Sequence, residues 1–88
     1  MAKPEIESGQ ALTLSQLSDD VLDKLRHAAI TDAELSARLI VEEVTGIEPR
    51  LFPLEQDRPV TQGAVVRADA MTIRRAQGEP LQYVLGHW

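Results

Sequence analysis

Apolar side chains recur at the spacing of a helix face in the first half of the sequence. The first series has intervals of three, four, four and three residues, at Leu14, Leu17, Val21, Leu25 and Ala28. Such intervals place all members on one side of an α-helix. Thr13 and Gln16 open the series with the spacing of a capping box, in which each side chain bonds the backbone amide of the other residue. We therefore predict a helix from about Leu14 to Ala29.

A second apolar series follows Thr31-Asp32-Ala33-Glu34, which is another capping-box pattern. Acidic side chains in the first turn also suit the positive end of the helix dipole. The series is dense and comprises Leu35, Ala37, Leu39, Ile40, Val41 and Val44. Because apolar residues occupy much of the circumference, we expect this helix to be central in the fold. We predict that it spans roughly Asp32 to Thr45 and stops at Gly46, since glycine takes the left-handed conformation without steric penalty.

A short helix is predicted between two prolines after Gly46. Pro49 suits the first turn of a helix, and Pro53 limits its length. We expect the apolar side chains of this segment to form a one-turn plug over the core; they are Leu51, Phe52 and Leu54. Residues 55–60 are predicted to form a loop.

A long helix is predicted to begin after Thr61, its N-cap, and to continue to about Gln77. One edge carries Ala64, Ala68 and Met71, and we expect a wider apolar face that also includes Val65, Val66, Ala70 and Ile73. Arg74 and Arg75 lie in the last turn, where positive charge complements the helix dipole. Gly78 ends the helix, and Pro80 prevents it from resuming.

These elements predict an all-α fold, a small bundle of four to five helices followed by a short C-terminal connector segment. We divide the chain into a flexible tail at residues 1–11, a helical bundle at 12–78 and a connector at 79–88. No segment before residue 80 alternates in the manner of a β-strand.

Composition narrows the classes of function. The 88 residues suffice for one small domain and carry a net charge of −5. That charge argues against binding to nucleic acid and to anionic membranes, both of which attract clustered positive charge. The sequence has no cysteine, no secretory leader and no apolar run long enough to cross a bilayer, so we expect a cytoplasmic location.

The sequence offers no set of residues that would support catalysis. His27 and His87 are far apart and have no partner at metal-ligand spacing, so His27 is better explained as a charge near the end of its helix. No serine lies in a nucleophile elbow, and the glycines match neither the dinucleotide nor the P-loop pattern. We therefore expect no catalytic, cofactor-binding or metal-binding residue within these 88 residues.

The last fifteen residues are the most informative part of the chain. They contain Tyr83 and Trp88, two of only three aromatic residues. The segment is consistent with a short helical turn packed between helices, or with a connection to a further domain. Arg74 and Arg75 also have two interpretations: they complement the helix dipole in solvent, or they contact an acidic partner or linker.

Two segments carry a resemblance to a known family. Arg-Arg-x-x-Gly-Glu-Pro-Leu-Gln-Tyr-Val-Leu-Gly, residues 74–86, resembles the end of the N-terminal helical domain of the release factor glutamine methyltransferases, the HemK/PrmC family. Residues 32–46, with an acid-rich start, several leucines and a closing glycine, are similar to that family's second helix.

The resemblance implies that the chain is a fragment. Family members continue into a Rossmann-like methyltransferase domain that uses S-adenosylmethionine, and their Asn-Pro-Pro-Tyr motif and Gly-rich cofactor loop are absent from this sequence. The parent enzyme methylates the glutamine of the Gly-Gly-Gln motif in peptide-chain release factors. The helical domain is understood to hold the release factor against the catalytic domain. The implied partners are thus the release factor and the enzyme's own C-terminal methyltransferase domain.

Our leading hypothesis is a non-catalytic docking domain of such a methyltransferase, and the alternative is a free-standing helical adaptor module. We expect residues 78–88 to form the joint to the catalytic domain. The proposed contact residues are Arg74, Arg75, Pro80, Leu81, Gln82, Tyr83, Leu85 and Trp88. Coding sequence that continues past Trp88 would favour the first hypothesis, whereas a stop codon there would favour the second.

Overall fold

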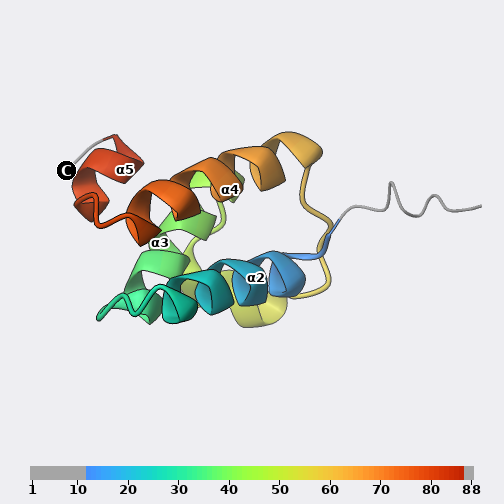
Figure 1. Ribbon diagram of the computed structural model, residues 1–88. Helices are drawn as coiled ribbons and strands as arrows, with labels where there is room; N and C mark the ends of the chain where they lie inside the picture. Colours follow the sequence, from blue (N-terminus) through green and yellow to red (C-terminus); the bar gives the residue numbers. More distant parts are fainter. Residues whose placement is uncertain (1–11, 87–88) are drawn as a thin grey trace, which may run out of the picture.

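The computed structural model describes residues 12–86, which form five helices and no strand (Figure 1). Their bounds are α2 Leu14–His27, α3 Ala33–Thr45, the 3₁₀ helix η1 Pro49–Leu54, α4 Gln62–Ala76 and α5 Leu81–Leu85. This arrangement confirms the predicted all-α bundle. The tail at residues 1–11 and the residues His87 and Trp88 lie outside the described part.

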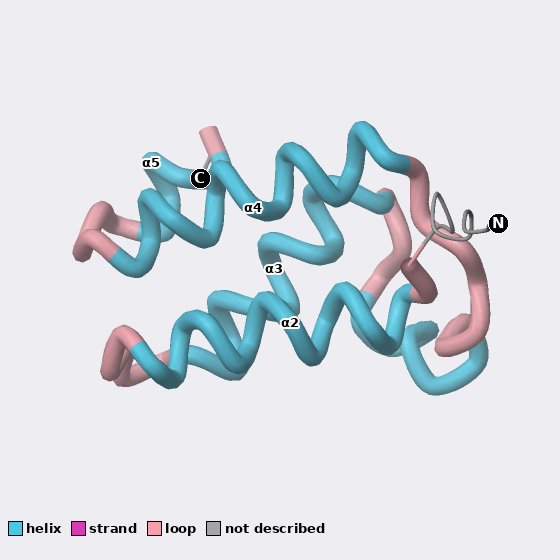
Figure 2. Tube along the Cα trace, turned by 45° about the vertical axis from the view of Figure 1, so that its right-hand side comes forward, coloured by secondary structure: helices cyan, strands magenta, loops and turns pink. Residues whose placement is uncertain are grey.

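Helix α3 lies at the centre of the bundle, between α2 on one side and α4 on the other (Figures 1 and 2). It contacts each of the other four helices. Its side chains Ala37, Ile40, Val41 and Val44 are buried together with Leu14, Leu17, Val21 and Leu25 from α2 and Ala64 and Ala68 from α4. The prediction of a central helix is therefore confirmed, with Leu35 as the exception, since that side chain is 45% exposed.

Helix α2 begins as the sequence predicts. The backbone amide of Thr13 donates to Gln16 Oε1 over 2.9 Å, and the amide of Gln16 donates to Thr13 Oγ1 over 3.2 Å, which completes the capping box. Its predicted stop at Ala29 is wrong, because α2 ends at His27. Ala29 instead takes a left-handed φ of 60° and leads the chain out of the helix.

The predicted capping box of the second helix is not formed. Asp32 rather than Thr31 is the N-cap residue of α3, and no side chain caps the helix there. The side chain of Glu34 binds Arg26 over 2.6 Å instead of reaching back to the helix start. The Asp32 carboxylate is likewise bound elsewhere, by Arg75 and Ser36. The helix end is as predicted, at a left-handed Gly46 with φ of 75°.

The short helix η1 begins at Pro49, as predicted, but covers the core only in part. Leu51 and Phe52 pack against the core, whereas Leu54 is 82% exposed and is not part of the plug. The loop that follows is bound to the start of α2. Leu14 donates its amide to Arg58 O, and Val60 donates its amide to Leu12 O, each over 2.8 Å.

Helix α4 begins at its predicted cap, where Thr61 Oγ1 accepts from the Ala64 amide over 3.0 Å, and it ends before a left-handed Gly78. The predicted wide apolar face is wrong in part. Ala64 and Ala68 are buried, but Val66, Ala70 and Ile73 are exposed. Helix α4 buries Ala64, Ala68 and Thr72, which share one side of the helix, while the side with Val66, Ala70 and Ile73 faces solvent. None of the described helices is long and apolar enough to cross a membrane.

Candidate interdomain site at the C-terminal connector

Arg75 joins the start of α3 to the segment that follows α4. Its guanidinium group donates from Nη2 to Asp32 Oδ1 over 2.9 Å, from Nε to Ser36 Oγ over 3.2 Å and from Nη1 to the carbonyl oxygen of Glu79 over 3.0 Å. The Arg75 side chain is only 16% exposed, and Ser36 is fully buried. A planar guanidinium presents several donors in fixed directions, so one side chain can hold three partners at once. Arg75 therefore fixes the connector to the bundle.

Arg74 holds the next part of the connector. Its Nε donates to Glu79 Oε1 over 3.0 Å and its Nη2 to the other carboxylate oxygen, which makes the pair bidentate. The same Nη2 donates to the carbonyl oxygen of Tyr83 over 3.1 Å. The two neighbouring arginines thus bind Glu79 from two directions, one through its side chain and one through its backbone.

These contacts favour the ionised form of both carboxyl groups. The hydrogen bond from Arg75 holds the pKa of Asp32 below its ordinary value, and the positive charge of Arg75 and the Ser36 hydroxyl act in the same direction. The hydrogen bond from Arg74 lowers the pKa of Glu79 in the same way. Both carboxyl groups are therefore ionised at neutral pH, as the two ion pairs require.

Helix α5 lies across the end of the bundle and contacts α3 and α4. Val84 is 2% exposed, and Leu81 and Leu85 pack in part against the core. On the outer side of α5, Pro80, Gln82 and Tyr83 are exposed, and the exposed fraction of Tyr83 is 58%. The structure therefore brings together seven of the eight residues proposed from the sequence, while Trp88 lies outside the described residues.

Asp32, Ser36 and Glu79 belong to this site but were not singled out from the sequence. Asp32 and Ser36 are four residues apart and so share one face of α3, which is the only local signal of the cluster. Ser36 Oγ donates to Asp32 Oδ1 over 3.2 Å while it accepts from Arg75. The decisive partner, Arg75, comes from a different helix, and that pairing cannot be read from sequence spacing.

A hollow with a volume of about 310 Å³ lies beside the connector, between α3 and α5. It is lined by Leu39, Glu42, Glu43, Gly46 and Leu85. Two carboxylates at its wall give it negative charge. It has no basic or hydroxyl side chain among its lining residues, so the lining provides neither a nucleophile nor a phosphate-binding group.

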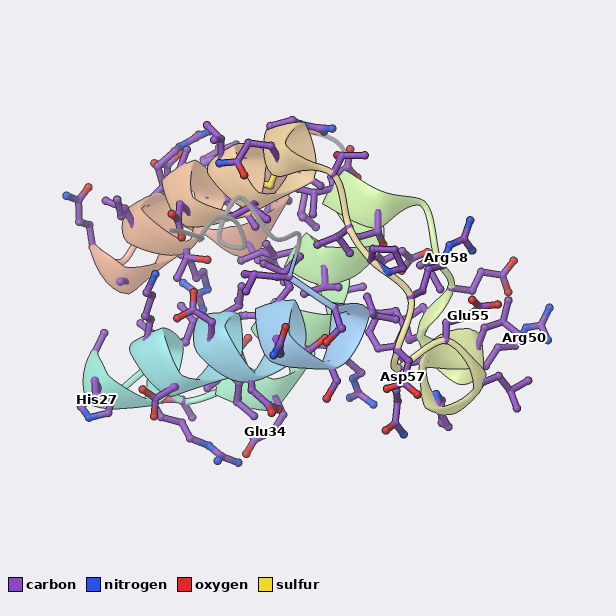
Figure 3. The ribbon with its side chains drawn as sticks, turned by 90° about the vertical axis from the view of Figure 1, so that its right-hand side faces the viewer. His27, Glu34, Arg50, Glu55, Asp57 and Arg58 are labelled. Carbon is purple, nitrogen blue, oxygen red and sulfur yellow. The ribbon has the colours of Figure 1, made fainter. Side chains whose placement is uncertain are left out.

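Several other charged residues lie at the two ends of the bundle (Figure 3). His27 ends α2, with Nδ1 placed 2.8 Å from the carbonyl oxygen of Asp23. Figure 3 shows Arg50, Glu55, Asp57 and Arg58 gathered around η1 and its loop, at the opposite end of the bundle from His27. Among residues 12–86 no group of three or more histidine, aspartate or glutamate side chains is placed to hold a metal ion.

The sequence of residues 16–86 matches the family model described as the PrmC N-terminal domain. The chain belongs to this family. As a PrmC N-terminal domain it includes α2, α3, η1, α4 and α5, with the arginine contacts of the connector inside the matched range. No solved structure matches the chain.

Curated relatives of this PrmC N-terminal domain carry the name release factor glutamine methyltransferase. The relative from Agrobacterium fabrum is 41% identical over 64 residues, which cover 73% of this chain and 22% of the relative. The relatives from Rhodospirillum rubrum and Bifidobacterium longum are 34% and 36% identical, and the matches cover 24% and 27% of their lengths. The chain thus spans about a quarter of the length of the curated relatives it matches.

Proposed function

We propose that this chain is the substrate-docking domain of a methyltransferase that modifies a glutamine side chain of peptide-chain release factors. The observation that carries the proposal is the family match over residues 16–86, together with three relatives named for that activity. Because this chain corresponds to about a quarter of each relative, we assign the transfer chemistry and the S-adenosylmethionine site to the remaining part of the enzyme.

A separate docking domain suits this reaction for a physical reason. The enzyme must select one glutamine on a large protein, and contacts far from the reacting nitrogen can supply the necessary binding energy and orientation. The bundle can present a surface of fixed shape, because its core is formed by three mutually packed helices, α2, α3 and α4. We propose that the domain binds the release factor in the cytoplasm. We expect the domain itself to contact neither nucleic acid nor a membrane.

We further propose that the connector joins this domain to the methyltransferase domain. A helix of five residues is too short to be stable by itself, so α5 depends on its contacts with the bundle. Arg74 and Arg75 provide the polar contacts, while Leu81 and Leu85 provide apolar ones. The exposed side of α5, with Pro80, Gln82 and Tyr83, then remains for the second domain, and Trp88 would extend the same joint.

The test compares a full-length release factor glutamine methyltransferase that contains this domain with a version that lacks residues 12–78. We expect the shortened enzyme to methylate intact release factor with a KM raised ~10-fold or more, because the docking contacts are lost. Methylation of a short Gly-Gly-Gln peptide should be unchanged, since the peptide reaches only the catalytic domain. Equal loss of activity toward both substrates would contradict a docking role.

A further inference from the structure

The side of α4 that faces away from α2 and α3 has an apolar centre. Val66, Ala70 and Ile73 lie four and three residues apart and therefore form one stripe, which we call the α4 outer face. Val66 and Ile73 are each 57% exposed. The solvent side of a surface helix is ordinarily polar, so an apolar stripe at its centre is a candidate interaction surface.

No part of residues 12–86 covers this stripe. Helix α4 packs on its neighbours through Ala64, Ala68 and Thr72, which lie on the opposite side of the helix and are buried. Figures 1 and 2 show the outward side of α4 without another helix across it. The stripe is therefore available to a partner.

The charged side chains beside the stripe indicate the chemistry of that partner. Asp69 also flanks the stripe, but it is paired with Lys24 of α2 over 3.0 Å. Arg67 is exposed next to Val66, and no carboxylate within residues 12–86 pairs with it. Six other basic side chains in this range are bound in ion pairs with carboxylates: Lys24, Arg26, Arg50, Arg58, Arg74 and Arg75. An unpaired cation on a protein with a net charge of −5 is complementary to an apolar segment that carries a carboxylate.

The small area of the stripe also limits which kind of partner can bind there. A stable, specific interface buries ~1,200–2,000 Å² in total. About two turns of a helix with three small or medium apolar side chains fall well short of that area. The stripe therefore suits a partner that also binds another part of the enzyme at the same time. A protein substrate bound to the second domain meets this condition, whereas a second copy of this chain does not.

We infer that the α4 outer face binds the release factor, through a segment of that protein with apolar side chains and a carboxylate opposite Arg67. This inference rests on the proposed function and adds the location of the docking surface. Ile73 and Val66 are the apolar anchors, and Arg67 is the charged contact at the edge.

The experiment is a titration of the ¹⁵N-labelled chain with unlabelled release factor, followed by NMR. We expect the amide resonances of Val66, Arg67, Ala70 and Ile73 to shift, while those of η1 stay in place. Two variants, Ile73→Asp and Arg67→Glu, should each weaken binding ~10-fold, which corresponds to about 1.4 kcal/mol. Both positions are exposed, so circular dichroism should show an intact fold.

Matched controls are available elsewhere on the surface. Leu54→Asp changes a more exposed apolar residue on η1, and Arg38→Glu changes another exposed arginine outside the ion pairs described above. We expect either control to alter the affinity for release factor less than ~2-fold, because surface charge changes outside an interface have small effects. Equal weakening by the controls and the test variants would overturn the assignment, since net charge alone would then explain the result.

The outcomes separate this inference from the proposed function. Binding of release factor with shifts confined to another surface would overturn the α4 assignment and leave the docking role in place. Absence of any shift at millimolar release factor would overturn the α4 assignment, and the comparison of KM values described above would then decide the docking role. Shifts of the same resonances on dilution of the chain alone, or on addition of the methyltransferase domain alone, would assign the face to a second copy or to that domain and would also overturn the inference.

Discussion

At Ala29 the chain leaves α2 through a left-handed turn that two hydrogen bonds close. The Ala29 amide donates to Arg26 O over 2.9 Å, and the Ile30 amide donates to Leu25 O over 3.1 Å. These bonds form a Schellman motif, in which glycine usually occupies the left-handed position. The end of α4 has the same motif with Gly78 at that position and a φ of 97°.

The two turns predict opposite effects of exchanging alanine and glycine. A left-handed alanine costs about 1–2 kcal/mol, whereas glycine costs about 0.4–1 kcal/mol more conformational entropy on folding. Ala29→Gly should therefore raise the free energy of unfolding by about 0.5–1 kcal/mol, and Gly78→Ala should lower it by about 1 kcal/mol. Urea denaturation measures both changes.

Sterics do not complicate this comparison. A Cβ atom added at Gly78 meets no atom within 4 Å, and Ala29 is exposed, so backbone conformation alone determines each sign. A stability loss in Ala29→Gly would show that the methyl group of Ala29 makes a contribution larger than the backbone strain. The same residue explains why sequence analysis placed the end of α2 too late: alanine is the best helix former and gives no stop signal, whereas Gly78 does.

At the scale of elements, Arg75 fixes the segment just before α5 to the bundle, because it binds the carbonyl oxygen of Glu79. Replacing Arg75 by alanine removes three hydrogen bonds and leaves the partly buried Asp32 carboxylate unpaired. We expect a loss of about 1–3 kcal/mol in the free energy that keeps the connector docked. Hydrogen exchange at the Val84 and Gly86 amides should therefore accelerate ~5-fold or more, while the core amides of α2 change little.

Two further variants separate geometry from charge in that measurement. Arg75→Lys keeps the positive charge but cannot hold three partners, so it should restore only part of the protection. Arg50→Ala removes an exposed ion pair with Glu48 on η1 and should leave exchange in α5 unchanged. Full protection in Arg75→Lys would mean that charge alone holds the connector.

The elements differ in how far the sequence predicts them. The starts of α2 and α4 follow from Thr13 and Thr61, because capping is a local interaction between residues three apart. The start of α3 also lies where the sequence predicts it, but without the predicted capping box, since the Asp32 side chain is bound to an arginine from α4. The face that α4 buries is also set by its neighbours: its apolar residues surround too much of the helix for the sequence to identify the buried side.

At the scale of the whole molecule, acid should weaken the fold through three ion-paired carboxylates. Hydrogen bonds from Arg75, Arg74 and Arg26 lower the pKa values of Asp32, Glu79 and Glu34 respectively. A carboxyl group with a lowered pKa in the folded state contributes its full stability above its unfolded pKa, about 4, and loses it as the pH falls below that value. We expect the thermal midpoint to fall between about pH 5 and pH 2.

Asp32→Asn tests the largest of these local networks. The variant should be less stable than the parent near neutral pH, and the difference should shrink as the pH falls below about 4, because protonation removes the same charge from the parent. Asp57→Asn is a suitable control, since Asp57 is exposed in the loop after η1 and lies outside the ion pairs. A constant difference between the parent and Asp32→Asn at all pH values would exclude ionisation as the cause.

The loop at residues 55–60 has a consequence for the tolerance of the fold to changes in chain length. Its backbone is bonded to the start of α2 through Leu12, Leu14 and Ser15, which are distant in sequence. An added residue there would break this register and displace α4 relative to α2. In the turn between α2 and α3, the amides of Ala28, Ala29 and Ile30 bond carbonyl oxygens of α2 and no distant segment. Insertions for labels or reporter peptides therefore belong in this turn, ahead of Asp32, whose carboxylate binds Arg75.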